Sequence, residues 1–377
     1  MPECYIGLMS GTSLDGVDGV IYDFAGQTAK ATTQVSGQVS AFASAPFSAS
    51  LRAELLALNS AGDNELHRAA LAANALTRVY AQVVAQLLAQ TNLKATDIRA
   101  IGAHGQTVRH RPGEFDGTGY TLQLNSPALL AELTQIDVVA DFRSRDVAAG
   151  GQGAPLVPAF HQDIFGHQNE AVAVLNMGGI SNLSVLGKDE PVLGFDCGPG
   201  NALMDHWCHM HSGQFYDADG AWAAAGQVNQ ALLKQLMAEP FIGKIPPKST
   251  GRDLFNPAWL QQYMQGFEDV APVDVQATLT ELTALAAAKN VKVFAGNAKT
   301  LVVCGGGALN GHLMRRLQAA LPSMVVASSE AFGLPPLQVE AAAFAWLARK
   351  AIRRETASFE SVTGAQGSRI LGSIYPA

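Results

Sequence analysis

The sequence predicts an α/β fold with two domains, on three observations. Strand-like apolar runs alternate with helix-like runs along the chain, which is typical of α/β proteins. The 377 residues are enough for two domains of ordinary size. The pentapeptides MSGTS (9–13) and MGGIS (177–181) resemble each other, and each follows an apolar strand and leads into another. Because they lie almost half the chain apart, they indicate a duplicated hairpin.

Composition limits the class of protein. Hydrophobic residues make up 48% of the chain, enough for large cores, and the net charge of -7 argues against nucleic acid as the main partner. We find no apolar run long enough to span a membrane and no secretory leader, so no membrane partner is expected. The four scattered cysteines lack any C-x-x-C pair, which favours reduced, buried thiols in a cytoplasmic protein.

The first half of the chain opens with a predicted hairpin over residues 5–24. Residues 50–91 are rich in Ala and Leu with few helix breakers, so they predict helix. The segment IRAIGAHGQTV is typical of a strand that runs into a polar turn, and DVVADFRSRD of a strand that ends in alternating charges. In TLQLNSPALLAEL, a strand precedes a helix with Ser126 as N-cap and Pro127 at the first helical position.

The second half repeats this alternation. AVAVLNMGGISNLSVLG predicts two strands with a small-residue turn, and LVVCGGGALNGHLMRRL predicts a strand, a glycine turn and a helix. SMVVASSE predicts the next strand, and PPLQVEAAAFAWLARKAI a late helix. The glycine-rich stretch 148–158 is a candidate domain boundary. We expect one domain over 1–145 with about 345–377, and a second over 146–344.

Both small-residue turns are candidate phosphate sites. Without a Cβ in the way, backbone N–H groups can approach an anion closely, and Gly11 and Gly178-Gly179 fit that description. Asp15 and Asp18 are candidate ligands for Mg²⁺. The alternative is that both segments are hairpin turns and nothing more. No G-x-x-x-x-G-K-[ST] run is present, which excludes a P-loop kinase.

The segment from strand LVVC to Glu330 also imitates a dinucleotide-binding unit. Its glycines Gly305 and Gly307 are followed by Asn310 where the third glycine of the fingerprint should stand. An oxidoreductase is therefore one alternative, and an adenosine site in a nucleotide-dependent kinase explains the same glycines.

A candidate general base follows the apolar run VLGF. Asp196 precedes Gly198-Pro199-Gly200, so we expect it at the end of a buried strand, before a helix that starts near Asn201. Burial can tune such a carboxylate for proton transfer. The alternative is an aspartate that caps a turn.

Eight segments together make the chain similar to one family. They are GLMSGTSLDGVD (7–18), GAHGQTVRH (102–110), ADFRSRDVAAGGQGAPLVP (140–158), LNMGGISNLS (175–184), GFDCGPGNALMD (194–205), PPKSTGRDLFN (246–256), VCGGGALN (303–310) and LPPLQVEAAAFAWLA (334–348). The chain resembles the anhydro-N-acetylmuramic acid kinases over nearly its whole length.

This resemblance implies a two-domain actin-like ATPase fold with a central interdomain cleft, a homodimer, and ATP with Mg²⁺ as cofactors. It implies ATP contacts from two phosphate hairpins and an adenosine turn. These correspond to Gly11, Thr12, Ser13, Leu14, Asp15, Gly16, Val17 and Asp18, to Asn176, Gly178, Gly179 and Ser181, and to Gly305, Gly306 and Gly307.

The reaction that the resemblance implies couples two steps. Water opens the 1,6-anhydro bridge at the anomeric carbon, and the freed O6 takes the γ-phosphate. The product, N-acetylmuramic acid 6-phosphate, enters cell-wall recycling. Asp196 would deprotonate the water. Cys197 stands where the family commonly has threonine, which leaves the hydrogen bonding near Asp196 open. A sensor built on the same fold is an alternative, although it would have no need of a base.

The resemblance also implies sugar contacts from His104, Gln106, Arg143, Gly198 and Glu340. A guanidinium suits the lactyl carboxylate of a muramic sugar, so Arg143 is our candidate ligand. Arg145 lies two residues further on, so in an extended segment it would share a face with Arg143. We assign Arg145 a structural role. The alternative for His104 is a structural histidine in a turn. The alternative for Glu340 is an acidic residue that stabilises the N-terminus of a helix.

Three further segments carry no assigned function. HWCHMH (206–211) holds several metal donors, but no second cluster completes a set. YDADGAW lacks the acids of a calcium loop, so it predicts a turn. Lys248, Ser249 and Arg252 in PPKSTGRD could approach the site, and the sequence assigns them no roles.

Overall fold

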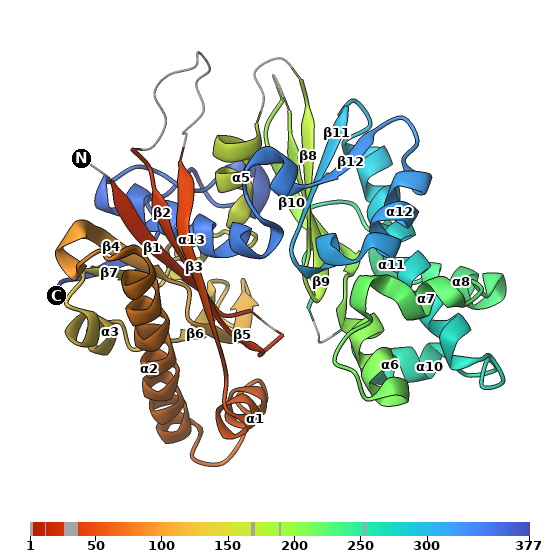
Figure 1. Ribbon diagram of the computed structural model, residues 1–377, viewed down its shortest axis with the longest axis horizontal. Helices are drawn as coiled ribbons and strands as arrows, with labels where there is room; N and C mark the ends of the chain where they lie inside the picture. The colour runs from red at the N-terminus through yellow and green to blue at the C-terminus, as the bar shows by residue number, and fades with distance from the viewer. Residues whose placement is uncertain (1–2, 12, 26–36, 167–169, 188–189, 252–253) are drawn as a thin grey trace. The chain divides into compact units, whose positions relative to one another are not determined.

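The computed structural model describes residues 3–11, 13–25, 37–166, 170–187, 190–251 and 254–377 (Figure 1). The chain forms two compact units. Unit 1 comprises Met1–Ile164 and Gln338–Ala377, and unit 2 comprises Phe165–Leu337. Residues 146–164 and 338–344 therefore belong with unit 1, whereas the sequence places them in the second domain.

The glycine-rich stretch 148–158 lies inside unit 1 because the C-terminal segment holds it there. Gln152 N–H donates to Thr363 O at 2.8 Å, and Gln366 N–H donates to Ala149 O at 2.8 Å. The buried Asp146 accepts from the Thr363 hydroxyl at 2.8 Å and from Gly153 N–H at 2.7 Å. These bonds are long-range in sequence, so composition alone could not locate the boundary.

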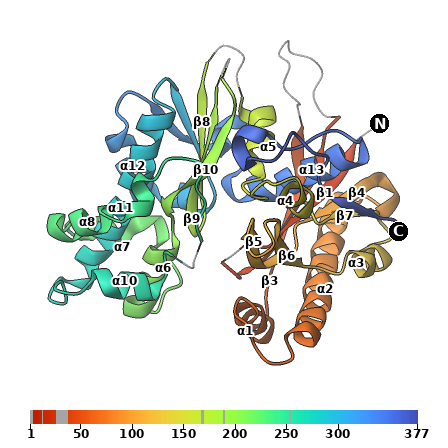
Figure 2. The ribbon, with the colours of Figure 1, turned by 180° about the vertical axis from the view of Figure 1, so that it is seen from behind.

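Unit 1 is built on a six-stranded sheet. Its strand order is β13-β7-β4-β1-β2-β3, in which β1, β4 and β7 are parallel and β2, β3 and β13 run antiparallel to their neighbours. Figure 2 shows β13 beside β7, near the C-terminus. The strands are β1 (Cys4–Met9), β2 (Gly16–Asp23), β3 (Gln38–Pro46), β4 (Ile98–Ala103), β7 (Val138–Ala140) and β13 (Ser373–Tyr375), and β5 (Gln106–Pro112) pairs with β6 (Gly119–Leu124) as a separate hairpin.

Most of the helices that the sequence predicts for unit 1 are present in the structure. The predicted helical stretch 50–91 is divided into α1 and α2 by a polar turn, and helix α4 begins at Ser144 within DFRSRD, where the sequence predicts strand. Ser126 is the N-cap residue of α3, although its side chain makes no capping bond. The helices are α1 (Ala49–Ala57), α2 (Glu65–Thr91), α3 (Pro127–Thr134), α4 (Ser144–Ala148), α5 (Val157–Phe165), α13 (Val339–Ile352) and α14 (Glu360–Thr363), with the 3-10 turn η1 (Ala95–Asp97).

Unit 2 repeats the same sheet design. Its order is β10-β9-β8-β11-β12, with β9 antiparallel to both β8 and β10, and with β8, β11 and β12 parallel. This matches β3-β2-β1-β4-β7 in order and direction, so the predicted duplication of the hairpin is confirmed. Two α/β units of this kind form the two-domain actin-like fold that the resemblance implies. The strands are β8 (Val172–Met177), β9 (Ile180–Leu186), β10 (Leu193–Pro199), β11 (Thr300–Cys304) and β12 (Val325–Ser328).

The helices of unit 2 enclose a core centred on α11. Residues such as Val275, Leu279 and Leu282 of α11 join Leu175 and Phe195 of the sheet in one apolar cluster. The helices are α6 (Ala202–Ser212), α7 (Ala221–Ala225), α8 (Gln230–Met237), α9 (Pro240–Gly243), α10 (Pro257–Tyr263), α11 (Pro272–Phe294) and α12 (Gly311–Ala320), with the 3-10 turns η2 (Ala218–Gly220), η3 (Gly306–Leu309), η4 (Ser329–Phe332) and η5 (Pro336–Gln338).

Two glycines let α13 lie directly on the sheet of unit 1. Gly7 of β1 and Gly102 of β4 are paired in register. A Cβ at Gly7 would stand 1.8 Å from Ala341 O, and one at Gly102 would stand 2.0 Å from Phe344 O. Gly7, the first residue of GLMSGTSLDGVD, thus allows the helix to pack closely. The Ala-rich face of α13 fits the flat surface that the two glycines leave.

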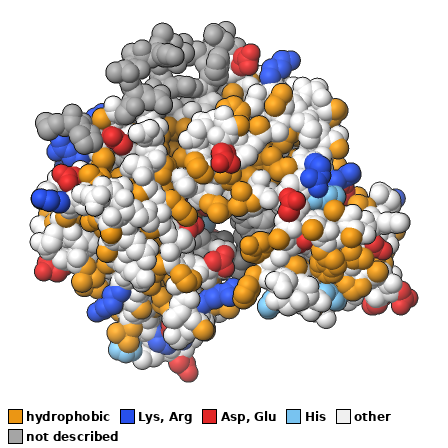
Figure 3. Space-filling model, in the orientation of Figure 1, with side chains coloured by type: hydrophobic (Ala, Val, Ile, Leu, Met, Phe, Trp, Pro, Cys, Tyr) orange, Lys and Arg blue, Asp and Glu red, His pale blue; other side chains and the backbone are white. Residues whose placement is uncertain are grey.

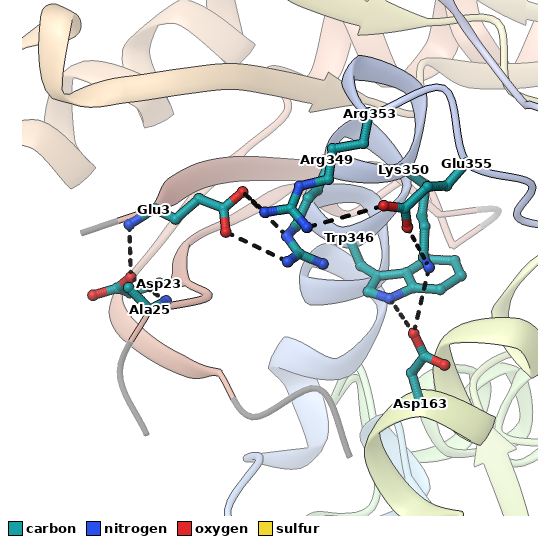
Figure 4. A network of polar contacts seen from close by, with 9 residues as sticks. All are labelled: Glu3, Asp23, Ala25, Asp163, Trp346, Arg349, Lys350, Arg353 and Glu355. Carbon is teal, nitrogen blue, oxygen red and sulfur yellow. Dashed lines mark hydrogen bonds and ion pairs between the residues drawn. The ribbon is translucent and has the colours of Figure 1, made fainter. Parts of the chain in front are cut away.

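Polar contacts also fasten α13 within unit 1 (Figure 4). Arg353 donates to Glu3 at 2.7 Å and Arg349 to the same carboxylate at 3.3 Å, just before β1 begins. Trp346 Nε1–H donates to Asp163 Oδ2 of α5 at 2.8 Å. These partners lie far from α13 in the sequence, so they tie together the ends of unit 1.

The described surface carries charges of both signs. On the face drawn in Figure 3, acidic and basic side chains are interspersed among neutral and apolar ones. Among the described residues, no helix has the length and apolar character that a bilayer crossing requires.

Candidate active site

The first candidate phosphate turn joins β1 and β2 in unit 1. Leu14 N–H donates to Gly11 O at 3.2 Å, and Leu14 adopts a left-handed φ of 58°. The side chains of Leu14 and Val17 are buried in the core, so the described part of this turn can offer a ligand its backbone atoms and the side chains of Ser13 and Asp15. Gly16 meets Ala45 O of β3, which a Cβ would approach to 2.3 Å. Thr12 lies outside the described residues.

Asp15 and Asp18 lie near this turn, and Asp15 is exposed. Burial raises the pKa of Asp18, a hydrogen bond with Ser44 lowers it, and the charge of Asp15 raises it again. The charge of Asp15 therefore disfavours ionisation of Asp18, although burial has the larger effect.

The turn between β4 and β5 packs against the first phosphate turn. Gly105 N–H donates to the Tyr80 hydroxyl at 3.0 Å, and the Ser10 hydroxyl lies 3.0 Å from both Tyr80 Oη and Gly105 O. Gln106 Nε2 donates to Gly11 O at 3.1 Å. The Gln106 side chain is buried, and its Oε1 has no hydrogen-bond partner among the described residues. Such an atom is costly to bury unless a ligand uses it.

His104 links this pair of turns to Arg143. Its Nδ1 lies 3.2 Å from Ser10 O, so Nδ1 carries the proton, and Nε2 accepts from Arg143 Nη2 at 3.0 Å. Burial, together with the charge of Arg143, lowers the pKa of His104 to about 3. The ring is therefore neutral and contacts Phe344 of α13 at 4.7 Å between centroids.

Arg143 is held from two sides. Besides its bonds to His104, its Nη1 donates to Gly153 O at 2.8 Å. The predicted extended segment is wrong here, because Arg143 is the N-cap residue of α4. Arg145 does not share its face, since residues two apart on a helix point in different directions. Glu340 lies in the first turn of α13, also in unit 1.

The second candidate phosphate turn, Gly178-Gly179, joins β8 and β9 in unit 2. Its carbonyls accept from the start of α6, with Asn201 N–H donating to Gly178 O at 2.8 Å. A Cβ at Gly200 would stand 2.2 Å from Gly178 O, so only glycine fits there. The buried Ser181 hydroxyl donates to Pro199 O at 3.3 Å, which gives it a structural partner.

The glycine turn 305–307 packs on the end of β8. Gly305 has a φ of 78°, and a Cβ there would meet Asn176 Oδ1 at 2.6 Å. A Cβ at Gly307 would meet Met177 at 2.6 Å, and Gly306 faces the Asn201 amide. Unit 2 thus brings together Asn176, the second phosphate turn and the predicted adenosine turn. Asn310 caps α12 by accepting from Leu313 N–H at 3.0 Å.

Asp196 lies within β10 rather than at its end, because β10 continues to Pro199. The pairing of β10 with β9 shifts register between Asp196 and Gly198, which is a β-bulge. Thr250 N–H donates to Asp196 Oδ2 at 2.9 Å, and Asp196 N–H donates to Lys248 O at 3.2 Å. The segment PPKST therefore lies alongside the candidate base. Gly198 is buried against Ala286 of α11.

Cys197 points into the core of unit 2, where its side chain is buried among apolar residues. Burial raises the pKa of its thiol far above the ordinary value. The thiol is therefore protonated and packs as a small apolar group. Arg252, of the same family-like loop as Lys248 and Ser249, lies outside the described residues.

Comparison with known proteins shows the family of this chain. Residues 3–377 match the family model described as anhydro-N-acetylmuramic acid kinase. The chain belongs to the anhydro-N-acetylmuramic acid kinase family. Proteins of that name from Albidiferax ferrireducens and Variovorax paradoxus are each 64% identical, with the whole chain covered and 100% and 99% of the relatives covered. The one from Cupriavidus pinatubonensis is 58% identical over 99% of the chain and 98% of the relative.

The kinase therefore belongs to a family of ATP-using phosphotransferases, and this favours the kinase hypothesis over both the sensor and the oxidoreductase. Among the described residues, HWCHMH included, no group of three or more His, Cys, Asp or Glu side chains is arranged to hold a metal ion. His209 instead stacks on Phe215, and Trp207 lies against His211. In YDADGAW, Asp217 accepts from Trp222 and Ala223 N–H, which confirms the predicted turn.

Sequence reasoning missed Ser10, Tyr80, Asn201 and Thr250 as site-building residues. The sequence offered an indication for Tyr80, because a hydroxyl group within the apolar stripe of α2 needs a hydrogen-bond partner. Thr250 contributes through its backbone N–H, which no side-chain pattern reveals.

Proposed function

We propose that this kinase acts on 1,6-anhydro-N-acetylmuramic acid and ATP, and yields N-acetylmuramic acid 6-phosphate for cell-wall recycling. The observation that carries the proposal is the geometry of Asp196. Its carboxylate is partly exposed, lies at a bulge of β10, and has Oδ2 fixed by the Thr250 N–H. A carboxylate fixed in this way is suited to take a proton from a water molecule.

The chemistry follows from that proton transfer. Asp196 accepts a proton from water while the water oxygen bonds to the anomeric carbon. The bond from that carbon to O6 breaks, and O6 attacks the γ-phosphorus as ADP leaves. Because the charge on O6 passes to phosphorus, no free alkoxide has to form. Positioning and charge stabilisation then set the rate.

For the nucleotide, we propose that backbone N–H groups of the two small-residue turns bind phosphates. The candidates in unit 1 are Gly11 and Ser13, and those in unit 2 are Gly178 and Gly179. Gly305 to Gly307 would line the adenosine with backbone atoms, because the positions that a Cβ would take at these glycines face Asn176, Met177 and Asn201.

We propose that Mg²⁺ binds beside the first turn. Burial is the main cause that raises the pKa of Asp18 and the charge of Asp15 adds to it, and both carboxylates are candidate ligands of the ion together with the phosphates. Bound there, the ion would neutralise charge on the β- and γ-phosphates. An Asp18→Asn variant should need more Mg²⁺ for half-maximal activity, and an unchanged requirement would remove Asp18 from the site.

For the sugar, we propose Arg143 as the ligand of the lactyl carboxylate. The buried Gln106 Oε1, which lacks a partner among the described residues, supports a sugar hydroxyl nearby. Glu340 is the candidate for further hydroxyl contacts. We also propose that the kinase is a cytoplasmic homodimer, which localisation of a tagged chain and light scattering would test.

The product formed in ¹⁸O-water tests both halves of the reaction. One ¹⁸O at the anomeric carbon, together with phosphate on O6, is the expected mass-spectrometric result. A phosphorylated product with the anhydro bridge intact would overturn the coupled mechanism. A sensor protein would form no product at all.

The Asp196→Asn variant tests the base. We expect turnover to fall by about 1,000-fold, within the range of general-base catalysis, while nucleotide binding is retained. Steady-state kinetics and nucleotide titration measure the two properties separately. Near-normal turnover of this variant would show that Asp196 is not the base.

A further inference from the structure

The ammonium group of Lys248 is buried in unit 2, and the proposed reaction leaves it without a use. Only 5% of the surface of residue Lys248 is exposed. Its Nζ donates to Phe241 O at 3.3 Å and to Ile242 O at 3.4 Å, at the end of α9. It also lies 5.0 Å from the Phe241 ring centroid and 5.6 Å from that of Phe195. Burying a lysine costs free energy, so its retention calls for a reason.

The backbone around Lys248 forms the outer support of Asp196. Lys248 O accepts from Asp196 N–H, and two residues later Thr250 N–H donates to Asp196 Oδ2. The same short segment therefore holds both the main chain and the carboxylate of the candidate base. On its other side, the segment is fastened to α9 by the Lys248 ammonium.

We propose that Lys248 is a positioning residue for the Asp196 carboxylate, which it orients through the segment that ends at Thr250. The ammonium fixes the segment against the carbonyls of α9, and the segment presents the Thr250 N–H to Oδ2. This proposal rests on the proposed function, because it assumes that Asp196 is the base.

The electrostatic surroundings agree with this role. Burial lowers the pKa of Lys248, the negative charge of Asp196 raises it, and the ammonium groups of Lys289 and Lys244 lower it. The aromatic faces of Phe195 and Phe241 offset part of the cost of burying the charge.

Lys248→Met removes the ammonium and keeps the length of the side chain. We expect kcat to fall by about 100-fold, as for a reacting group displaced by about 1 Å. The KM values for sugar and nucleotide should stay within about threefold, because an interaction made in the transition state is lost. Lys289→Met and Lys244→Met are matched controls, since both residues are exposed neighbours of like charge. They should keep kcat within about twofold.

A double variant separates positioning from general stabilisation. In the Asp196→Asn background, Lys248→Met should cause no further loss of kcat, because the carboxylate that Lys248 positions is absent. A further loss as large as in the wild type, or a normal kcat in Lys248→Met alone, would overturn the proposal. If Asp196→Asn alone keeps normal turnover, the proposed base fails instead, which is a distinguishable outcome.

Amide hydrogen exchange gives a second readout that does not depend on turnover. In Lys248→Met, the peptide that contains Thr250 should exchange faster, while α11 keeps its protection. Unchanged exchange at Thr250 would also overturn the proposal. If Lys248→Met does not fold, Lys248→Gln, which removes the charge and keeps a polar amide group, serves in both experiments.

Discussion

At the scale of single residues, His104 shows how a predicted ligand acquires a different role. Sequence similarity places it among the sugar contacts, and its position after a strand agrees. In the structure, both ring nitrogens are engaged inside unit 1, with Ser10 O and with the Arg143 guanidinium. This geometry favours a role through Arg143, because a ring with both nitrogens bonded has little left to offer a substrate.

The His104→Phe variant tests this role. Loss of a hydrogen bond to a charged group costs about 1.5–3 kcal/mol, so the KM for the sugar should rise by about tenfold or more. The KM for ATP should change little, and steady-state kinetics with each substrate varied gives both values. His104→Gln, which can donate and accept, should recover part of the loss.

Two comparisons make that experiment decisive. His67→Phe changes an exposed histidine of α2 and should leave both KM values unchanged. In an Arg143→Ala background, His104→Phe should have no additional effect on the KM for the sugar. A full additional effect there would mean that His104 contacts the sugar itself.

At the scale of elements, the contact of α13 with the sheet depends on the glycine pair in β1 and β4. Alternation of apolar residues predicts both strands, and the Ala-rich sequence predicts the helix. Why Gly7 and Gly102 are glycine is not visible in the sequence, because the backbone of α13 that they approach lies more than 200 residues away.

Gly102→Ala should therefore destabilise the kinase. The new Cβ would overlap Phe344 O, and overpacking of this kind costs about 1–3 kcal/mol. Urea unfolding should show a lower midpoint. Gly62→Ala is the matched control, since its Cβ would meet the end of the flexible Arg68 side chain at 3.3 Å. Equal midpoints for both variants would contradict the packing argument.

At the scale of the whole molecule, two buried histidines make stability depend on pH. Burial lowers the pKa of both His104 and His161 to about 3, with the charge of Arg143 contributing for His104. In the unfolded chain the pKa is about 6.5. Below that value the unfolded state binds more protons than the folded state, so stability is complete above about pH 6.5 and falls as the pH falls.

Between these pKa values, each histidine should lower the free energy of unfolding by about 1.4 kcal/mol for each unit by which the pH falls. Thermal unfolding at about pH 7 and about pH 5.5 should therefore show a smaller acid shift in His161→Leu than in the wild type. The readout is the difference between two pH values, so a lower starting stability of the variant does not obscure it. His67→Leu should behave as the wild type, and an unchanged shift in His161→Leu would contradict the linkage.

The sequence by itself determined the α/β class, the duplicated hairpin, most helices and strands, and the family. These depend on local periodicity, turn chemistry and long motifs, which a single chain displays directly. The hairpin at 9–13 and its counterpart at 177–181 were recognisable because small residues are required wherever backbone must turn tightly.

Only the tertiary structure decided which unit holds the stretch 148–158, that Arg143 caps a helix, and that Thr250 fixes Asp196. Each depends on backbone groups or on partners remote in sequence, and such contacts leave no periodic trace. The bulge at Cys197 and the burial of Lys248 belong to the same class. They follow from how β10, α9 and the segment before Thr250 pack together, which no one of these segments specifies alone.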